Sequence, residues 1–519
     1  MVYLLFKLLS ENMNKFLQKY QFDGLLMLGL TLLYFATRLF NLTVVPMFTD
    51  EAIYMRWSQV GLQDAAWRFI PLTDGKQPLY HWFVMGVMSL KVFSDPLIEG
   101  RIVSVMAGFI TAIAIGILTY VLFKRRLTAY LATMLYIVSP FMLVYDRLAI
   151  VDSLLTTISV VSLLFAVLVV KYVRLDLALL LGLSIGAGML TKSSGLLFLL
   201  LSPVTLLLSS WPKKKRLKQL GLLIFFFLVV VILSQSLYSI LRLSQFFYRI
   251  SQKNYEFIIP LSDFIRSPFS MTWGNLQSLI KWQVGYLTIP WLVLVFISWF
   301  HKEYWREHLM LVIYVVFPMI LMASFNKIIF PRFLVFSTPF LIIMVASGLT
   351  YVTSKIKLEK FKFLAVLLAI LLPAFISLTW LISPGQAAIP QADKNQYYLG
   401  QPSGHGVKEI VQYLEEQALE EPIFLGTDGT FGLTPDAFLV YLRDNENVHI
   451  EGYYPVKEIP QEVREKAQDV PTYFVYYNVQ EIPEQQNLEL ISEFEKTSSD
   501  QVTYLRLFKV NKVELNEVE

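Results

Sequence analysis

The sequence predicts a polytopic α-helical membrane protein with a small α/β domain at its C-terminus. Three observations support this fold class. Hydrophobic residues make up 55% of the 519 residues and charged residues only 16%, whereas soluble domains carry about 25% charged residues. Long apolar runs recur between residues 24 and 382. Residues 385–519 lack such runs and hold 10 Lys or Arg against 24 Asp or Glu, a net charge of −14.

The rest of the chain has the opposite charge. Residues 1–384 hold 34 Lys or Arg against 16 Asp or Glu, a net charge of +18, which suits contact with anionic lipid head groups. We therefore expect membrane lipids as partners and no nucleic acid. The chain has no Cys, which excludes disulfides and thiol chemistry. Residues 1–20 lack a cleavage site after their short apolar run and are interpreted as a cytoplasmic amphipathic leader.

The apolar runs define the expected helices. A helix needs about 20 mostly apolar residues to cross a bilayer. About eleven spans are predicted by that rule, at residues 24–45, 98–123, 127–145, 150–170, 175–191, 194–211, 219–241, 284–300, 308–325, 332–353 and 362–382. Residues 78–94 are apolar but short, and we interpret them as an interfacial or re-entrant helix.

Basic residues orient these spans, because short cytoplasmic loops collect Lys and Arg. With the N-terminus in the cytoplasm, every inward loop is basic: Lys124 to Arg126, Lys171 and Arg174, Lys213 to Lys218, Lys302 and Arg306, and Lys355 to Lys362. The outer side of a cell membrane then holds residues 46–97, residues 242–283 and the C-terminal domain. We interpret residues 242–283 as a mobile lid over a lipid donor.

Carboxylates gather on the predicted outer side. Asp50 and Glu51 follow the first span directly, and such a pair at a membrane surface is costly unless it binds a cation, takes a proton or faces water. A solvated loop is the simpler alternative. Asp152 lies about one turn inside a span, which favours a functional role, although a helix N-terminus also stabilises an acid there. Asp146 is expected to cap or solvate its turn.

Cations are predicted at the same level of the membrane. Lys192 interrupts an apolar stretch and precedes Ser193, Ser194 and Gly195, where a helix N-terminus would bind phosphate oxygens. Further cations on this side are Arg38, Lys76, Arg101, Lys327 and Arg332. For any one of them, snorkelling toward the membrane surface is the alternative explanation. Their convergence with acids on one face indicates a site.

The order and sidedness of several motifs resemble one family, the protein O-mannosyltransferase and aminoarabinose transferase branch of the GT-C membrane glycosyltransferases. The resemblance rests on Asp50 and Glu51, KQPLYHW at 76–82, Arg101 in EGRIVSV, YDRLAIVDSLL at 145–155, GMLTKSSGLL at 188–197, and PRFLVFSTPFL at 331–341. The stretch IFLGTDGTFGLTPDA at 423–437 also resembles the tails of bacterial relatives.

This resemblance implies a GT-C fold and transfer of a sugar, with inversion, from a polyprenyl-monophosphate donor to a protein, lipid or glycan acceptor. It implies that Asp50 is the catalytic base, with Glu51 and Asp152 positioning the acceptor, tuning Asp50 or sharing a divalent cation. It assigns the donor phosphate to Arg147, Lys192, Arg332, Lys76 and Arg101.

The chain also departs from the family. Gln77 stands where many relatives carry a second Lys or Pro, and no dense His cluster is present. A zinc site is therefore not expected. A divalent cation stays open as a cofactor, with Asp50, Glu51 and Asp152 as its ligands if one binds.

Two other functions compete with a transferase. A flippase for a lipid-linked precursor would also need many spans and cations, but internal repeats and charges near the midplane would be expected. A non-enzymatic assembly protein would use its acidic tail to bind a partner, and would leave Asp50, Asp152 and Lys192 without a role.

The C-terminal region, residues 385–519, is predicted to alternate between helices and strands. Residues 406–418 have helical periodicity, and three short apolar runs bounded by turn signals predict strands, at 421–429, 471–479 and 502–510. Gly429 and Gly432 are expected to shape a turn. Such a domain would recognise the acceptor or cover the mouth of the active site.

Overall fold

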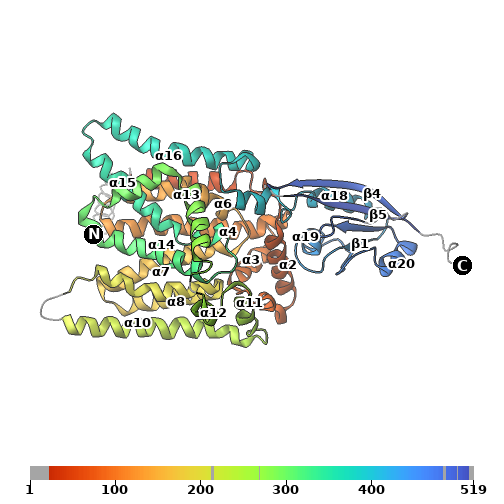
Figure 1. Ribbon diagram of the computed structural model, residues 1–519, viewed down its shortest axis with the longest axis horizontal. Helices are drawn as coiled ribbons and strands as arrows, with labels where there is room; N and C mark the ends of the chain where they lie inside the picture. The colour runs from red at the N-terminus through yellow and green to blue at the C-terminus, as the bar shows by residue number, and fades with distance from the viewer. Residues whose placement is uncertain (1–22, 212–215, 268, 483–486, 500, 513–519) are drawn as a thin grey trace, which may run out of the picture.

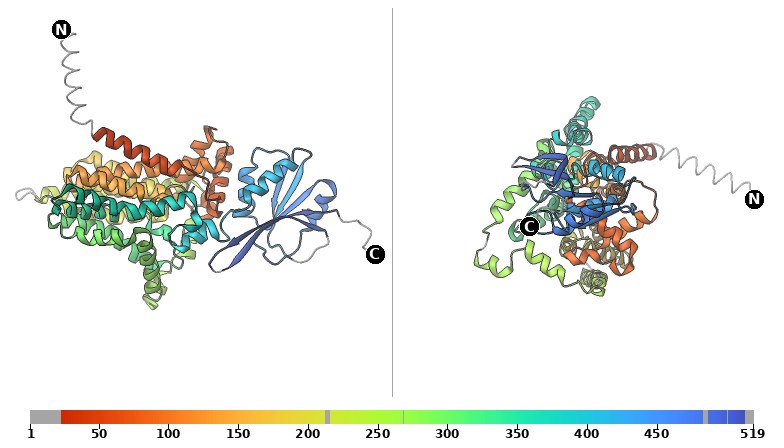
Figure 2. Two further views of the ribbon diagram at one scale, coloured as in Figure 1. Left: turned by 90° about the horizontal axis from the view of Figure 1, so that it is seen from above. Right: turned by 90° about the vertical axis from the view of Figure 1, so that its right-hand side faces the viewer.

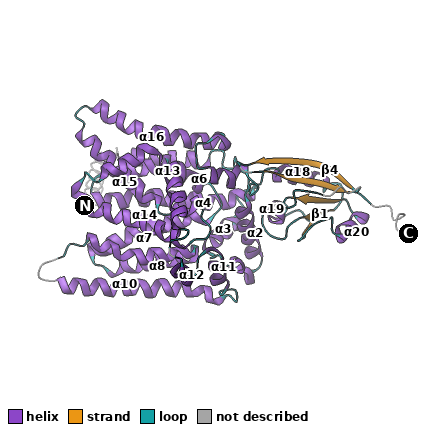
Figure 3. Cartoon of the chain, in the orientation of Figure 1, coloured by secondary structure: helices purple, strands orange, loops and turns teal. Residues whose placement is uncertain are grey.

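The computed structural model describes residues 23–211, 216–267, 269–482, 487–499 and 501–512. A helical bundle forms most of the molecule, and a five-stranded sheet with its helices lies beyond one end of the bundle (Figures 1 and 3). The other two views place the sheet at the same end (Figure 2). The predicted leader at residues 1–20 and the lysines at 213–215 lie outside the described residues.

Each predicted span coincides with helical structure. Residues 23–39 form the first helix. The later helices of the bundle are α4 (Pro96–Phe123), α5 (Arg126–Val138), α6 (Pro140–Asp146), α7 (Val151–Tyr172), α8 (Leu175–Thr191), α9 (Leu196–Leu201), α10 (Arg216–Tyr238), α13 (Thr272–Ser298), α14 (Trp305–Phe325), α15 (Thr338–Lys355) and α16 (Glu359–Ile382).

Not all of these helices are long enough to cross a bilayer unaided. Within the described ranges, six helices are long and apolar enough: α4, α7, α10, α13, α14 and α16. For α10 and α14 this length includes the 3-10 turn that adjoins each helix. The bent pair α5 and α6, which meet at 61°, makes a seventh. The helix α8 and the broken segment Ser193–Leu208 are apolar but shorter. The count of eleven spans thus stays a prediction.

Three of the predicted inward turns share one end of the bundle. Lys171 Nζ donates to the carbonyl of Val121 at 2.8 Å, and Tyr304 Oη donates to the carbonyl of Phe123 at 3.0 Å. These contacts bring the turns after α4 and α7 and the turn before α14 close together. Because α4 has 28 residues, its two ends lie about 42 Å apart, and its other end carries Arg101.

At that other end, short helices cover the bundle. The segment after the first helix forms α2 (Thr49–Gln63) and α3 (Leu79–Ser89), with 3-10 turns between them. The segment predicted as a loop at 242–283 is instead largely helical: it contains α11 (Arg249–Phe257), α12 (Leu261–Arg266) and the first half of α13, which is kinked at Thr288.

The C-terminal region forms a mixed sheet with strand order β2-β1-β3-β5-β4. The strand β1 pairs in parallel with β2 and with β3. The strand β5 pairs antiparallel with β3 and with β4. Its elements are α18 (Val407–Gln417), β1 (Ile423–Thr427), α19 (Leu433–Tyr441), β2 (Val448–Gly452), α20 (Gln461–Asp469), β3 (Thr472–Tyr476), β4 (Leu488–Thr497) and β5 (Val502–Val510). The helix α19 packs on α2 at the end of the bundle (Figure 1).

Candidate active site

The centre of the candidate site is Asp50, in the first turn of α2. Its Oδ2 accepts a hydrogen bond from Arg332 Nη1 at 2.5 Å, and its Oδ1 lies 3.7 Å from Lys76 Nζ. The Asp50 side chain is 19% exposed and that of Arg332 is 16% exposed. The sequence separates these two residues by 282 positions, and the fold brings them into direct contact.

A tight turn places Lys76 beside the Asp50 carboxylate. The 3-10 turn Ile70–Asp74 ends at Gly75, whose φ is 67°. A Cβ at Gly75 would lie 2.6 Å from the carbonyl oxygen of Arg249, so both the backbone conformation and the close approach require glycine. The Lys76 ammonium then lies 5.0 Å from the ring centre of Tyr54 and 5.5 Å from that of Trp57.

A second ion pair adjoins the first. Lys192 ends α8 in an extended conformation, and its Nζ donates to Asp152 Oδ1 at 2.8 Å. Asp152 is nearly buried whereas Lys192 is 27% exposed. The neighbouring Gln77 donates from Nε2 to Ser193 Oγ at 2.8 Å. We call Asp50, Lys76, Asp152, Lys192 and Arg332 the rim cluster.

Electrostatics favour the ionised forms of Asp50 and Arg332. Burial of the Asp50 carboxyl would raise its pKa, but the charges of Arg332, Lys76 and Lys192 outweigh burial and hold the pKa well below its ordinary value. Burial would likewise lower the pKa of Arg332, yet the nearby Asp50 carboxylate raises it. A base with so low a pKa removes protons poorly until its cations find another anion.

Glu51 differs from its neighbour Asp50. Its carboxylate forms a two-bond pair with Arg101, at 2.8 and 2.7 Å, and both side chains are fully buried. It also accepts from the backbone amide of Ala149 at 2.6 Å, while Arg101 donates to the carbonyls of Leu42 and Val45. In this structure the two residues hold α2 against α4, and the catalytic role of Glu51 and the phosphate-binding role of Arg101 stay predictions.

Arg147 is likewise engaged within the fold, and its phosphate-binding role also stays a prediction. It is 2% exposed, and its guanidinium donates to the carbonyls of residues 37, 38, 40 and 41. These carbonyls lie at the end of the first helix and in the turn that follows it, so Arg147 stabilises the end of that helix and its terminal nitrogens are engaged. Asp146, expected to solvate its turn, is instead buried and paired with Arg38 at 3.2 Å.

The three candidate carboxylates do not make a shared ligand set for a metal. Asp50 contacts Arg332, Glu51 contacts Arg101 and Asp152 contacts Lys192, so each faces a different cation. Within the described part of the chain, no three His, Cys, Asp or Glu side chains gather as metal ligands.

Sequence reasoning missed the link between residues 242–283 and the site. Lys253 Nζ lies 2.9 Å from Asp74 Oδ1, and Asp74 Oδ2 lies 3.4 Å from Lys76 Nζ. The helix α11 is thus linked to the rim cluster by two successive ion pairs through Asp74. No local pattern signals this pairing, because it joins segments about 180 residues apart.

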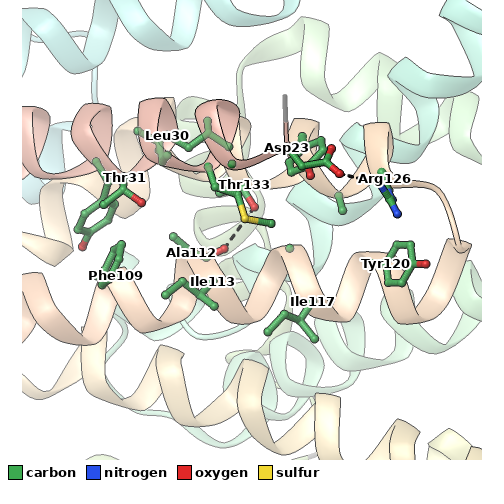
Figure 4. Close-up of a pocket in the computed structure, with 17 residues that line it drawn as sticks. Asp23, Leu30, Thr31, Phe109, Ala112, Ile113, Ile117, Tyr120, Arg126 and Thr133 are labelled. Atoms are coloured by element: carbon green, nitrogen blue, oxygen red, sulfur yellow. Dashed lines mark hydrogen bonds and ion pairs between the residues drawn. The ribbon is translucent and has the colours of Figure 1, made fainter. Parts of the chain in front are cut away.

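A large apolar cavity lies elsewhere. It has a volume of about 760 Å³ and runs between the first helix and the helices α4 and α5 (Figure 4). An ion pair between Asp23 and Arg126, at 2.6 Å, closes one end. None of the rim cluster lines it, so the rim cluster and this apolar cavity are separate.

Comparisons with known proteins show what the chain is similar to. The sequence model of the dolichyl-phosphate-mannose-protein mannosyltransferase family matches residues 75–235, which contain four of the motifs above. No curated protein matches the chain in sequence.

Solved structures share the fold. The ArnT structure from Cupriavidus metallidurans in the apo state has a TM-score of 0.57 at 15% identity, covering 95% of this chain and 98% of that chain. The same protein bound to undecaprenyl phosphate scores 0.57 at 13% identity, covering 94% and 98%. The archaeal oligosaccharyltransferase AglB from Archaeoglobus fulgidus, in complex with an inhibitory peptide and a dolichol-phosphate, scores 0.52 at 13% identity, covering 89% and 70%.

These findings define the fold of the chain. The chain has the GT-C membrane fold, with mostly apolar helices and a small C-terminal sheet, and the predicted resemblance to the O-mannosyltransferase and aminoarabinose transferase branch is confirmed.

Proposed function

We propose that this chain is an inverting glycosyltransferase that moves a sugar from a polyprenyl-monophosphate donor to an acceptor hydroxyl at the outer face of the membrane. The observation that carries the proposal is the pairing of a partly exposed Asp50 with Arg332 and Lys76. A carboxylate and two cations in one opening supply a base for the acceptor and a counter-charge for the phosphate. The fold shared with an ArnT structure bound to undecaprenyl phosphate supports this donor class.

The donor phosphate would lie among Lys76, Lys192 and Arg332. Each is partly exposed, at 28%, 27% and 16% of its side chain. Their present partners are carboxylates, and a phosphate would replace those contacts with charge-assisted hydrogen bonds. Charge that develops on the leaving phosphate is stabilised by the same three groups. Asp152 keeps Lys192 in place.

Donor binding would also activate the base. While Arg332 contacts Asp50, the pKa of that carboxyl is lowered. When the phosphate takes over Arg332 and Lys76, the pKa of Asp50 rises toward the working range of a general base. Asp50 then accepts the proton of the acceptor hydroxyl as its oxygen bonds to the anomeric carbon. The bond from that carbon to the phosphate oxygen breaks, and polyprenyl phosphate leaves with the electron pair.

One assay tests the proposal. Purified protein receives tritiated undecaprenyl-phosphate mannose in the presence of membranes as acceptor source, and release of undecaprenyl phosphate is followed. We expect turnover by the native protein and a loss of about 10²–10⁴-fold in Asp50→Asn. Asp176→Asn, which breaks an exposed pair with Arg174 elsewhere in the bundle, is the control. Native-like turnover in Asp50→Asn would refute Asp50 as base.

A further inference from the structure

The loop that follows β1 presents one aromatic side chain to solvent. Within residues 428–432 only Thr430 and Phe431 are exposed, and Phe431 is 51% exposed. The base of the loop is fixed, because the Asp428 carboxylate accepts hydrogen bonds from the backbone amides of residues 477–479 at 2.7 to 2.9 Å. The exposed ring is therefore held by a rigid support.

The topology of the sheet marks this loop as a binding position. The chain passes from β1 to β2 on one side and then crosses to β3 on the other. The carboxyl ends of β1 and β3 thus form a topological switch point, where open α/β sheets bind their ligands. Residues 428–432 and 477–479 occupy that point. Here it faces the bundle, because α19 packs on α2.

A continuous set of contacts joins the loop to the proposed base. The Phe431 ring lies 5.9 Å from the Trp57 ring, centre to centre. The Lys76 ammonium lies 5.5 Å from the Trp57 ring and 3.7 Å from the Asp50 carboxylate. At the other end of the loop, a Cβ on Gly432 would lie 3.6 Å from Thr49. The loop therefore follows α2 from the residue beside Asp50 to Trp57.

We propose that residues 428–432 and the facing surface of α2 bind the acceptor, and that the acceptor is an uncharged carbohydrate placed by stacking on Phe431. This inference rests on the proposed function. The distance between Asp50 and Trp57, seven residues along α2, is about 10 Å. An acceptor of more than one sugar ring would therefore contact Phe431 while its reacting hydroxyl lies at Asp50.

Charge and shape favour this acceptor class. The C-terminal region carries a net charge of −14, which repels anionic polymers and anionic lipid head groups. The apolar face of a sugar ring packs on an exposed aromatic ring, and the adjacent Thr430, which is exposed, offers a hydroxyl for a polar contact. A base such as Asp50 is needed only for an uncharged hydroxyl acceptor.

The test uses the full-length protein in membranes of the expressing cells, given tritiated undecaprenyl-phosphate mannose. Two quantities are measured: label transferred into the glycan and protein fractions, and affinity for undecaprenyl phosphate. We expect Phe431→Ala to lower transfer into glycan about tenfold, which corresponds to the loss of about 1.4 kcal/mol of acceptor binding, and to leave donor affinity unchanged. Phe431→Tyr should restore transfer.

The matched control is Leu419→Ala, an 85% exposed apolar residue of the same domain that precedes β1. Equal losses in both variants, or a loss of donor affinity in Phe431→Ala, would overturn the proposed acceptor site. Phe431-dependent label in protein instead of glycan would overturn the carbohydrate class. If the native protein neither binds nor cleaves the donor, the proposed function itself fails. If the native protein cleaves the donor and Phe431→Ala transfers sugar as well as the native protein does, only this inference is refuted.

Discussion

Two adjacent residues of α2 make the same kind of ion pair in opposite surroundings. Glu51 binds Arg101 with both side chains fully buried, whereas Asp50 binds Arg332 with both side chains partly exposed. The buried pair has its polar atoms satisfied by the protein itself. The other pair is partly exposed, and in the proposed function a donor phosphate would compete there for the cation. Exposure, and not residue type, would then separate a structural pair from a reactive one.

The largest effect expected from this comparison is on stability. Glu51→Gln leaves the Arg101 charge buried without its anion, which costs about 3–5 kcal/mol. We expect a strong fall in the unfolding temperature of the detergent-solubilised protein. Asp50→Asn should unfold close to the native temperature, because its cation is partly solvated. Equal unfolding temperatures for Glu51→Gln and the native protein would contradict the structural role of Glu51.

The next effect is on donor use. Arg332→Met removes one cation from the proposed phosphate site, and we expect kcat/KM for the donor to fall about 10²–10³-fold, the usual loss for one group that stabilises developing charge. Lys192→Met should act in the same direction. Arg174→Met, in an exposed pair elsewhere in the bundle, is the control. A loss in the control as large as in Arg332→Met would indicate a general effect of charge.

A smaller effect is expected in the pH dependence. The pKa of Asp50 is lowered while Arg332 and Lys76 contact it. The pH dependence of kcat/KM reports the free enzyme, so its acid limb should lie at low pH. In the donor complex those cations are engaged by phosphate. The acid limb of kcat should therefore lie at higher pH than that of kcat/KM. Coincident limbs would argue against activation of the base by the donor.

A third carboxylate completes the comparison, because among the described residues Asp393 is hydrogen-bonded to phenols and to no cation. Tyr145 and Tyr286 donate to its Oδ2, and burial raises its pKa to about 7. The unfolded chain would bind its proton only below about pH 4, so the stability from the protonated form is complete at low pH and is lost as pH rises through 7.

We therefore expect the contribution of Asp393 to lower the unfolding temperature of the native protein between about pH 4 and pH 7. In Asp393→Asn this part of the pH dependence should be absent. A change of about 2 °C is the expected scale. Thermal unfolding at a series of pH values measures it. An unchanged slope in Asp393→Asn would show that Asp393 is ionised in the fold.

The sequence predicted the helical and α/β parts because each rests on local patterns. Apolar runs marked the helices, and residues 406–418, 421–429, 471–479 and 502–510 correspond to α18, β1, β3 and β5. The strands β2 and β4 were missed. Their burial is partial or alternating, so neither is a continuous apolar run.

The site was predicted less completely, for a physical reason. Local sequence identified Asp50, Lys192 and Arg332 as charged groups at one level of the membrane, and the structure brings all three into the rim cluster. It did not separate them from Glu51 and Arg101, because burial depends on how α2 and α4 pack. Distant partners such as Asp74 and Lys253 leave no local pattern.

The most direct test of the account measures binding and transfer together in Asp50→Asn. If Asp50 competes with the donor phosphate for Arg332 and then acts as base, this variant should bind undecaprenyl phosphate at least as tightly as the native protein and transfer almost no sugar. Weaker binding of undecaprenyl phosphate together with preserved transfer would contradict it.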